Sequence, residues 1–257
     1  MPSNRSWYSR LWYLQHFNLF QEFTREELLP VARLVDPHEL ARHTHLYHSG
    51  DPADHVYFLI EGQVKIYGKN PSGRRVTLAL LRPGEVFGGL NTYPAYEQEA
   101  EALEPSTIYA LRTQDFHALL ESKPGLALQV VRRLGQREQL LERKIASLVL
   151  KDVPTRLAET LLELAEDFGR PCPHGFARDL VLTQQDLADL IGATRQIVNA
   201  TLKQWQHQGM IMLRRHRICL PDRDALRRAA TSANNPPKPA KLALHKGAVG
   251  SHSSCVK

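Results

Sequence analysis

Residues 182–205 read LTQQDLADLIGATRQIVNATLKQW, and this stretch decides the fold of the C-terminal part of the chain. Thr183 is a good N-cap for a short helix, and Gly192 suits a tight turn after it. Thr194 can cap a second helix, whose apolar residues are spaced to pack against the first. Two short helices around a glycine turn predict a helix-turn-helix at residues 183–203.

The second of these helices has a polar face that suits the major groove of DNA. Arginine matches the O6 and N7 acceptors of guanine, and glutamine and asparagine match N6 and N7 of adenine. The alternative is an ordinary helical hairpin with a solvated polar face. We predict DNA contacts from the two caps and from this face: Thr183, Thr194, Arg195, Gln196, Asn199 and Lys203.

The segment after the second helix reads as a β-hairpin with a basic tip. Residues 210–213 and 218–220 are short apolar runs, and the four residues between them read RRHR. A cationic tip beside a recognition helix can hold phosphates, which fixes the register of a protein on DNA without reading its sequence. The sequence therefore predicts a winged helix-turn-helix over residues 151–230, with phosphate contacts from Arg214, Arg215 and Arg217.

The basic residues are concentrated at the C-terminal end. The chain of 257 residues has a formal net charge of +6, but residues 182–257 hold twelve Lys or Arg against four Asp, a net charge of +8. A positive end on a near-neutral body is typical of a module that binds a polyanion, although a soluble protein with a basic tail has the same charge. Residues 231–257, rich in Ser, Asn, Pro, Lys and Ala, are predicted to be a disordered basic tail.

Composition excludes several classes of protein. Hydrophobic residues make up 42% and charged residues 23%, as in ordinary globular proteins. No run approaches the roughly 18 apolar residues that span a bilayer, and the first residues lack the apolar core of a signal peptide. We expect a reduced, cytoplasmic protein without a disulfide framework or a membrane partner, because its cysteines are scattered and odd in number: Cys172, Cys219 and Cys255.

The N-terminal half reads as a β structure. From about residue 38 to residue 111, short alternating or apolar runs are separated by turns rich in Gly and Pro, which is typical of a sandwich, jelly roll or barrel. We assign residues 17–124 to this barrel and residues 1–16 to an N-terminal extension. With the helical segments that follow, the fold class is α+β.

Residues 125–150 are predicted to form one long helix with an apolar seam. The seam residues are spaced alternately by three and four positions, and only Glu138 interrupts the apolar set. A second copy of the same helix would cover such a seam and give a two-fold dimer, whereas packing on its own domain is the alternative. The predicted dimer residues are Val131, Leu134, Glu138, Leu141, Ile145 and Leu148.

This order of parts resembles the cyclic-AMP receptor/fumarate–nitrate regulator (Crp/Fnr) family, from about residue 17 to residue 225. The likeness rests on GDPADHVYFLIEG at 50–62, PGEVFG at 83–88, KDV at 151–153 and LTQQDLADLIGATR at 182–195. It implies a cyclic-nucleotide-binding-type jelly roll, a dimerisation helix and a winged helix-turn-helix. It also implies a homodimeric transcription regulator that binds near-palindromic double-stranded DNA and contacts RNA polymerase as an activator, with repression as the alternative.

The resemblance places an effector pocket in the barrel and on the long helix, but it disfavours cyclic AMP. Members that bind cyclic AMP have a Gly-Glu pair followed by Arg-Ser/Thr-Ala, whereas this chain has Gly88-Gly89 and later Gln98-Glu99-Ala100. A cyclic phosphate would meet several carboxylates there and no arginine. The tentative effector residues are Gly88, Gly89, Leu90, Arg137 and Glu142.

The stretch at residues 167–195 looks most like the cyanobacterial global nitrogen regulators of that family, whose effector is 2-oxoglutarate. Arg137 and Glu142 fall where those regulators have a ligand-binding arginine and its glutamate partner. The second arginine of their site is missing here, so weak binding of a dicarboxylate is expected. An effector-independent regulator controlled by its abundance is the alternative.

Two rival readings concern metals and cofactors. His43-x-His45-x-x-His48 suggests a cupin-type metalloenzyme, but Ser49 and Gly50 stand where such sites add a glutamate, so we read a solvated strand and assign no metal ligands. The first cysteine is Cys172, which excludes an N-terminal iron–sulfur cluster. Haem ligation by a histidine such as His55 stays open, although no motif supports it. No nucleophile–base motif or paired-acid spacing indicates catalysis, so we do not expect an enzyme and assign no catalytic residues.

Overall fold

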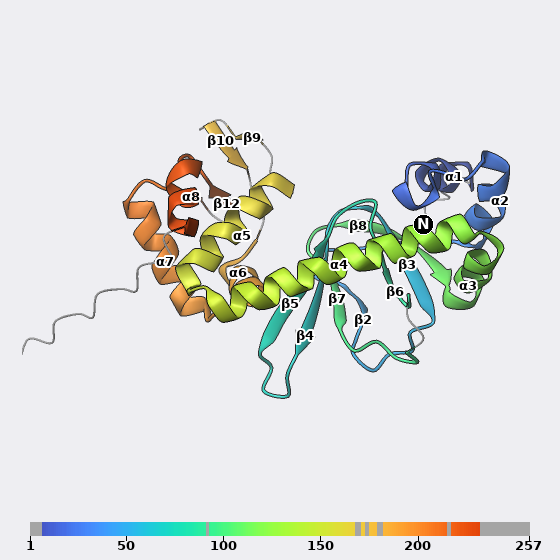
Figure 1. Cartoon of the computed structure of the whole chain (residues 1–257), viewed down its shortest axis with the longest axis horizontal. Coiled ribbons are helices and arrows are strands. Elements are labelled where there is room, and N and C mark those ends of the chain that lie inside the picture. The colour runs from blue at the N-terminus through green and yellow to red at the C-terminus, as the bar shows by residue number, and fades with distance from the viewer. Residues whose placement is uncertain are drawn as a thin grey trace, which may run out of the picture.

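The computed structural model describes residues 7–90, 93–167, 171–172, 175–178, 182–214 and 217–231. A β jelly roll lies at one end of the molecule and a mostly helical domain at the other, and the long helix α4 runs past the jelly roll to the helical domain (Figure 1). The predicted α+β class and the predicted order of parts are confirmed.

The jelly roll consists of two four-stranded antiparallel sheets. The first has the order β1-β8-β3-β6, and its strands are Asp36–Leu40, Ser106–Arg112, His55–Glu61 and Val86–Gly88. The second has the order β2-β7-β4-β5, and its strands are His45–Tyr47, Glu99–Ala102, Val64–Lys69 and Arg75–Leu81. Alternate residues of both sheets pack into one core, which includes Leu59, Ile66, Phe87, Ala100 and Ile108.

Three helical segments cover the N-terminal side of the barrel: α1 (Trp7–Gln15), η1 (Asn18–Phe20) and α2 (Arg25–Leu34). The segment assigned to an N-terminal extension thus contains a helix, whose Leu11 and Leu14 are buried in one cluster with Phe58 of β3. A helix of this length is marginal in water, so its stability depends on this packing, which the local sequence does not reveal.

Two consecutive helices follow β8: α3 (Thr113–Ser122) and α4 (Pro124–Leu150). Pro124 occupies the first turn of α4, where its missing N–H costs no hydrogen bond. Leu126 and Val130 bury the start of α4 against the barrel. Among the helices of the described residues, α4 included, none is long and apolar enough to cross a membrane.

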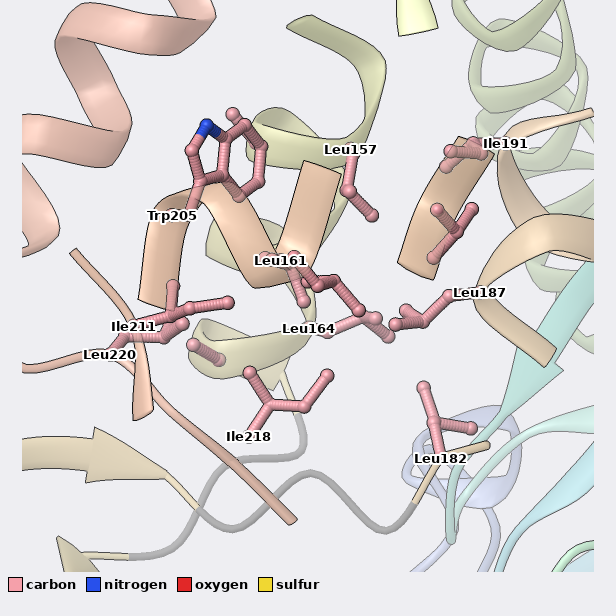
Figure 2. Close-up of a cluster of buried hydrophobic side chains, with 14 of the residues drawn as sticks. Leu157, Leu161, Leu164, Leu182, Leu187, Ile191, Trp205, Ile211, Ile218 and Leu220 are labelled. Atoms are coloured by element: carbon pink, nitrogen blue, oxygen red, sulfur yellow. The ribbon is translucent and has the colours of Figure 1, made fainter. Parts of the chain in front are cut away.

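The C-terminal domain contains α5 (Val153–Asp167), β9 (Pro171–Cys172), β10 (Gly175–Arg178), α6 (Gln184–Ile191), α7 (Arg195–His207), β11 (Met212–Arg214), β12 (Arg217–Cys219) and α8 (Arg223–Thr231). Figure 2 shows its core, in which Leu161 and Leu164 of α5 point toward Leu187 of α6. Trp205 of α7 and Ile211, Ile218 and Leu220 of the wing belong to the same buried cluster. The predicted tail began at residue 231, but Thr231 is the last residue of α8, because the helix continues one residue further than expected. The rest of the predicted tail, residues 232–257, lies outside the described residues, as do the side chain of Cys172 and all of Cys255.

Candidate nucleic-acid interface and effector pocket

The turn of the helix-turn-helix requires a glycine. Gly192 ends α6 with a φ of 64°, in the left-handed region that residues with a Cβ rarely adopt. At the start of α6, Thr183 and Asp186 form a reciprocal capping box. At the start of α7, the Oγ1 of Thr194 accepts a hydrogen bond from the N–H of Ile197, 3.4 Å away. The predicted caps and turn are therefore confirmed.

The face of α7 that points away from the core carries the side chains that we predicted to read bases. Arg195, Gln196 and Lys203 are exposed. Asn199 is only partly buried, and its Oδ1 accepts a hydrogen bond from Nε2 of Gln184 on α6, 3.4 Å away. The opposite face of α7 is buried through Val198, Leu202 and Trp205. The first turn of α7 is thus accessible to a large partner.

The wing forms as predicted, but its strands are placed differently. Arg214 ends β11 and Arg217 begins β12, and the two residues are paired in register. The apolar runs of the sequence predicted both residues in the connection, whereas they lie in the strands, because a two-residue hairpin connection pairs the residues that flank it. Arg215 and the side chains of Arg214 and Arg217 lie outside the described residues.

Tyrosine rings fill the interior of the barrel. The rings of Tyr47 and Tyr96 are stacked with their centroids 3.8 Å apart, and Tyr57 lies 5.9 Å from Tyr47. Burial raises the pKa of all three hydroxyls, so the rings are neutral. The hydroxyl of Tyr96 donates a hydrogen bond to the carbonyl oxygen of His55, 2.9 Å away. The barrel core is therefore aromatic and uncharged.

The glycine pair of the predicted effector pocket is packed against this core. Gly88 has a φ of 95°, and a Cβ on it would lie 2.7 Å from Cδ2 of Tyr57. The N–H of Gly89 donates to the carbonyl oxygen of His55, and the N–H of Leu90 donates to that of Gly88, both over 2.8 Å. These main-chain donors are therefore already used within the chain.

The predicted effector residues are only partly brought together. Leu90 and Arg137 line a small cavity of about 40 Å³ between the barrel and α4. This volume is far below the roughly 300–1,000 Å³ of typical ligand pockets. The other three predicted effector residues are Gly88, Gly89 and Glu142. They line neither this cavity nor a second, larger cleft described below, and Glu142 is exposed.

The larger cleft is open, measures about 1260 Å³ and lies between the barrel, α4, α5 and α6. Burial lowers the pKa of Lys144 to about 8 and raises the pKa of Glu163. In the part of the chain that the structure describes, Arg137 has no ion-pair partner, whereas Arg82 binds Asp167 over 2.7 Å. The cations that line the cleft include Arg132, Arg133, Arg137, Arg143, Lys144 and Arg156.

Two family models match the chain. Residues 37–123 match the cyclic nucleotide-binding domain, and residues 155–229 match the Crp-like helix-turn-helix domain. The global nitrogen regulator of Nostoc sp. is 31% identical over 205 residues, which cover 78% of this chain and 90% of that protein. The chain belongs to the Crp/Fnr family. It is a transcriptional regulator with a helix-turn-helix DNA-binding domain.

Two further comparisons cover most of this Crp/Fnr regulator. The CRP-like cAMP-activated global transcriptional regulator of Mycobacterium tuberculosis is 29% identical over 220 residues, covering 84% of this chain and 98% of that protein. The structure of a CooA mutant from Carboxydothermus hydrogenoformans has a TM-score of 0.70 at 27% identity and covers 85% of this chain and 98% of that chain. Membership of the Crp/Fnr family explains the jelly roll, so the cupin alternative is not needed to explain it.

The long helix of this Crp/Fnr regulator has an uncovered apolar face. Val131 and Ile145 are each 62% exposed. Leu148, the last predicted seam residue, is partly buried. It packs closely against the turn of the helix-turn-helix, where a Cβ placed on Gly192 would lie 2.8 Å from Cδ2 of Leu148. The other five residues of the predicted seam are exposed, and we call them the α4 stripe: Val131, Leu134, Glu138, Leu141 and Ile145.

A buried ion pair that the sequence analysis did not foresee joins the barrel to the helix-turn-helix. The Nζ of Lys65 on β4 lies 3.1 Å from Oδ1 of Asp186 on α6 and 3.3 Å from Oε2 of Glu101 on β7. Burial opposes ionisation of Asp186, but the hydrogen bonds from Thr183 and the charge of Lys65 outweigh it and lower the pKa of this carboxyl. The first helix of the DNA-binding motif is therefore docked on the barrel through charge.

The histidines of the predicted solvated strand separate into two groups. His43 turns toward Glu101, with Nδ1 2.9 Å from Oε1. His45 and His48 instead face the buried Glu99 of β7, and their rings are stacked 4.6 Å apart. Burial lowers the pKa of His45, which favours the neutral imidazole. The sequence next to these histidines has no glutamate, but the fold brings Glu99 to them from β7, a strand far along the chain.

Proposed function

We propose that this regulator binds a near-palindromic DNA site as a homodimer, with one copy of α7 in the major groove of each half-site. The exposed first turn of α7 carries the proposal, because Arg195 and Gln196 follow the Thr194 cap, where a recognition helix meets base edges. The wing would hold the flanking phosphates and set the register.

Pairing of two α4 helices would cover the α4 stripe. Val131 and Ile145 expose large apolar side chains in the single chain, and knobs-into-holes packing removes such side chains from water. A two-fold axis along α4 would place the two copies of α7 about one DNA turn, roughly 34 Å, apart. The spacing of the half-sites follows from this geometry.

The effector side of the proposal disfavours cyclic AMP as a ligand of the barrel. The stacked tyrosines occupy the interior, and the N–H groups of Gly89 and Leu90 already donate to main-chain carbonyls. We propose instead that any effector is a small anion such as 2-oxoglutarate, bound at Arg137, which faces both cavities. A regulator without an effector, controlled by its abundance, is the competing proposal.

We extend the proposal to activation through contact with RNA polymerase, which rests on the family resemblance. A repressor built on the same fold would differ in where its operator lies. In vitro transcription from a promoter that carries the selected site decides between the two outcomes.

The experiment is a selection from a labelled library of randomised palindromes with the purified, untagged full chain. It is run without effector, with 2-oxoglutarate and with cyclic AMP. We expect a two-fold site and no response to cyclic AMP. Enhancement by 2-oxoglutarate that Arg137→Ala abolishes supports the anion site, and a two-fold site unchanged by either compound supports the effector-independent regulator. Failure to select any site contradicts the proposed DNA recognition.

A further inference from the structure

We propose that His45, His48 and Glu99 form a binding site for a divalent transition-metal ion of the zinc class. The site lies on the β2-β7-β4-β5 sheet, on the face turned away from the barrel core. Val64, Ile66 and Ala100 point into that core, so their neighbours in the strands point to the opposite face.

Two of the three distances between the ligand atoms suit one ion. The Nε2 of His45 and the Nδ1 of His48 each lie 3.6 Å from Oε2 of Glu99, and all three atoms lie within 4.8 Å of one another. Two ligands bound to zinc at about 2.0–2.2 Å with tetrahedral angles are roughly 3.3–3.6 Å apart. Both nitrogen–oxygen distances therefore already match a shared ion.

Coordination requires the rotation of one ring and the release of one hydrogen bond, because the Tyr67 hydroxyl donates to Glu99 and therefore accepts from Nε2 of His45, which must give up that proton to bind an ion. The imidazoles of His45 and His48 are stacked with an interplanar angle of 27°, whereas a bound ion must lie near the plane of each ring. The side chain of His48 is 58% exposed, so its ring can turn without disturbing the core. His45 is partly buried and fixes the position of the first ligand.

The surroundings orient the carboxylate. The hydroxyl of Tyr67 donates a hydrogen bond to Oε2 of Glu99 over 2.6 Å and lies 2.9 Å from Nε2 of His45. The ammonium of Lys69 lies 3.7 Å from the other oxygen, Oε1, and Arg75 lies over the Tyr67 ring. These partners hold the carboxylate in place, as outer-shell groups do in metal sites. The positive charges of Lys69 and Arg75 are balanced by Glu99 and by its neighbour Glu101.

Ligand chemistry favours ions of the zinc class over calcium or magnesium. Two imidazoles and one carboxylate suit zinc and its first-row neighbours, whereas calcium and magnesium require oxygen ligands. Three protein ligands leave a further position for water or for another ligand, as in open zinc sites. We assign no catalysis to this position.

The test uses the full chain, free of any purification tag and treated with chelator. Zinc alone is titrated by calorimetry, and cobalt alone is titrated while the visible absorption of its bound form is recorded. We expect one ion per chain, and we expect saturating zinc to raise the temperature of thermal unfolding. His48→Gln and Glu99→Gln should each weaken binding more than tenfold, and circular dichroism checks that both variants are folded.

The matched control is His43→Asn, which changes a histidine of the same hairpin that binds Glu101 instead. Asparagine tolerates the positive φ of 65° at this position. This variant should bind zinc like the parent chain. The proposal is overturned if the parent chain takes up no stoichiometric ion, if His48→Gln binds as the parent does, or if His43→Asn loses binding to the same extent. Retained binding in the folded Glu99→Gln variant would likewise place the ion elsewhere, for example on cysteine thiolates.

Discussion

The Nζ of Lys65 in the barrel lies 3.1 Å from Oδ1 of Asp186, the residue that closes the capping box of the first helix of the DNA-binding motif. Their side chains are only 3% and 13% exposed. One carboxylate therefore both holds the start of α6 and docks the DNA-binding domain on the barrel. Glu101 shares the same ammonium group from the neighbouring strand.

Lys65→Met should destabilise the chain strongly. The change removes the cation and leaves Asp186 and Glu101 buried without it, which typically costs about 3–5 kcal/mol. Denaturant unfolding measures the free energy of unfolding. Lys69→Met on the same strand is the control, because this exposed lysine should contribute less than about 1 kcal/mol. Equal effects of the two substitutions would contradict a structural role for the buried pair.

The same pair predicts a change in acid stability. The pKa of Asp186 is lowered in the folded chain, so its contribution to stability is present above the unfolded pKa near 3.8 and is lost as the pH falls through the lower folded pKa. Without Lys65 the folded pKa rises, and part of this contribution is lost. Because a smaller gap between the folded and unfolded pKa leaves less stability to lose on acidification, the free energy of unfolding, followed from pH 7 to pH 3, should fall less steeply in Lys65→Met than in Lys69→Met, and the difference between the two variants should narrow. Parallel curves would show that Asp186 does not sense Lys65.

Lys144 predicts a second pH dependence of stability, at alkaline pH. Burial lowers its pKa in the folded chain to about 8 from 10.5, so between these values the unfolded chain binds more protons and stability rises with pH. Lys144→Met removes a desolvated charge and should be more stable than the parent at pH 7, by about 1–3 kcal/mol. The difference should narrow as the pH rises from about 8 toward 10.5. A difference independent of pH would assign the effect to packing instead.

Ile145→Lys should dissociate the proposed dimer. It puts a charge in the α4 stripe, where pairing of two α4 helices would bury it at a cost of several kcal/mol. Sedimentation velocity at micromolar concentration should show a dimer for the parent and a monomer for the variant, with circular dichroism unchanged. Gln139→Lys is the control, since Gln139 is exposed on the same helix outside the stripe. If the variant sediments as the parent does, the interface lies elsewhere.

Local signals explain which parts of this fold were predictable. Thr183, Gly192 and Thr194 each define a cap or a turn within a few residues, so the helix-turn-helix could be predicted in detail. The contact between Lys65 and Asp186 spans 121 positions, and only the strand pairing and domain packing create it. From the sequence alone, Lys65 between Val64 and Ile66 indicates only that one face of this strand is polar, and it does not identify the partner of the lysine.

The effector pocket was harder to predict than the DNA-binding face for a geometric reason. Arg137 and Glu142 occupy the positions that the family resemblance implies, but five positions along a helix turn a side chain by about 140°. Arg137 therefore faces the barrel while Glu142 is exposed. Within the described single chain the two side chains do not line one pocket, which their spacing along the sequence alone did not reveal.

Arg195→Ala should change specificity as well as affinity. The arginine is exposed in the first turn of α7, where a bidentate contact to guanine O6 and N7 is worth about 1–3 kcal/mol. Binding to the selected operator should weaken by that amount, and preference should relax at one guanine in each half-site. Lys203→Ala is the comparison: if Lys203 contacts only phosphate, its loss weakens binding to all sequences alike and lowers the salt dependence. Fluorescence anisotropy against the operator and its single-base variants measures both effects. A uniform loss for Arg195→Ala, without relaxed preference at any guanine, would assign this arginine to the backbone and leave base reading to Gln196.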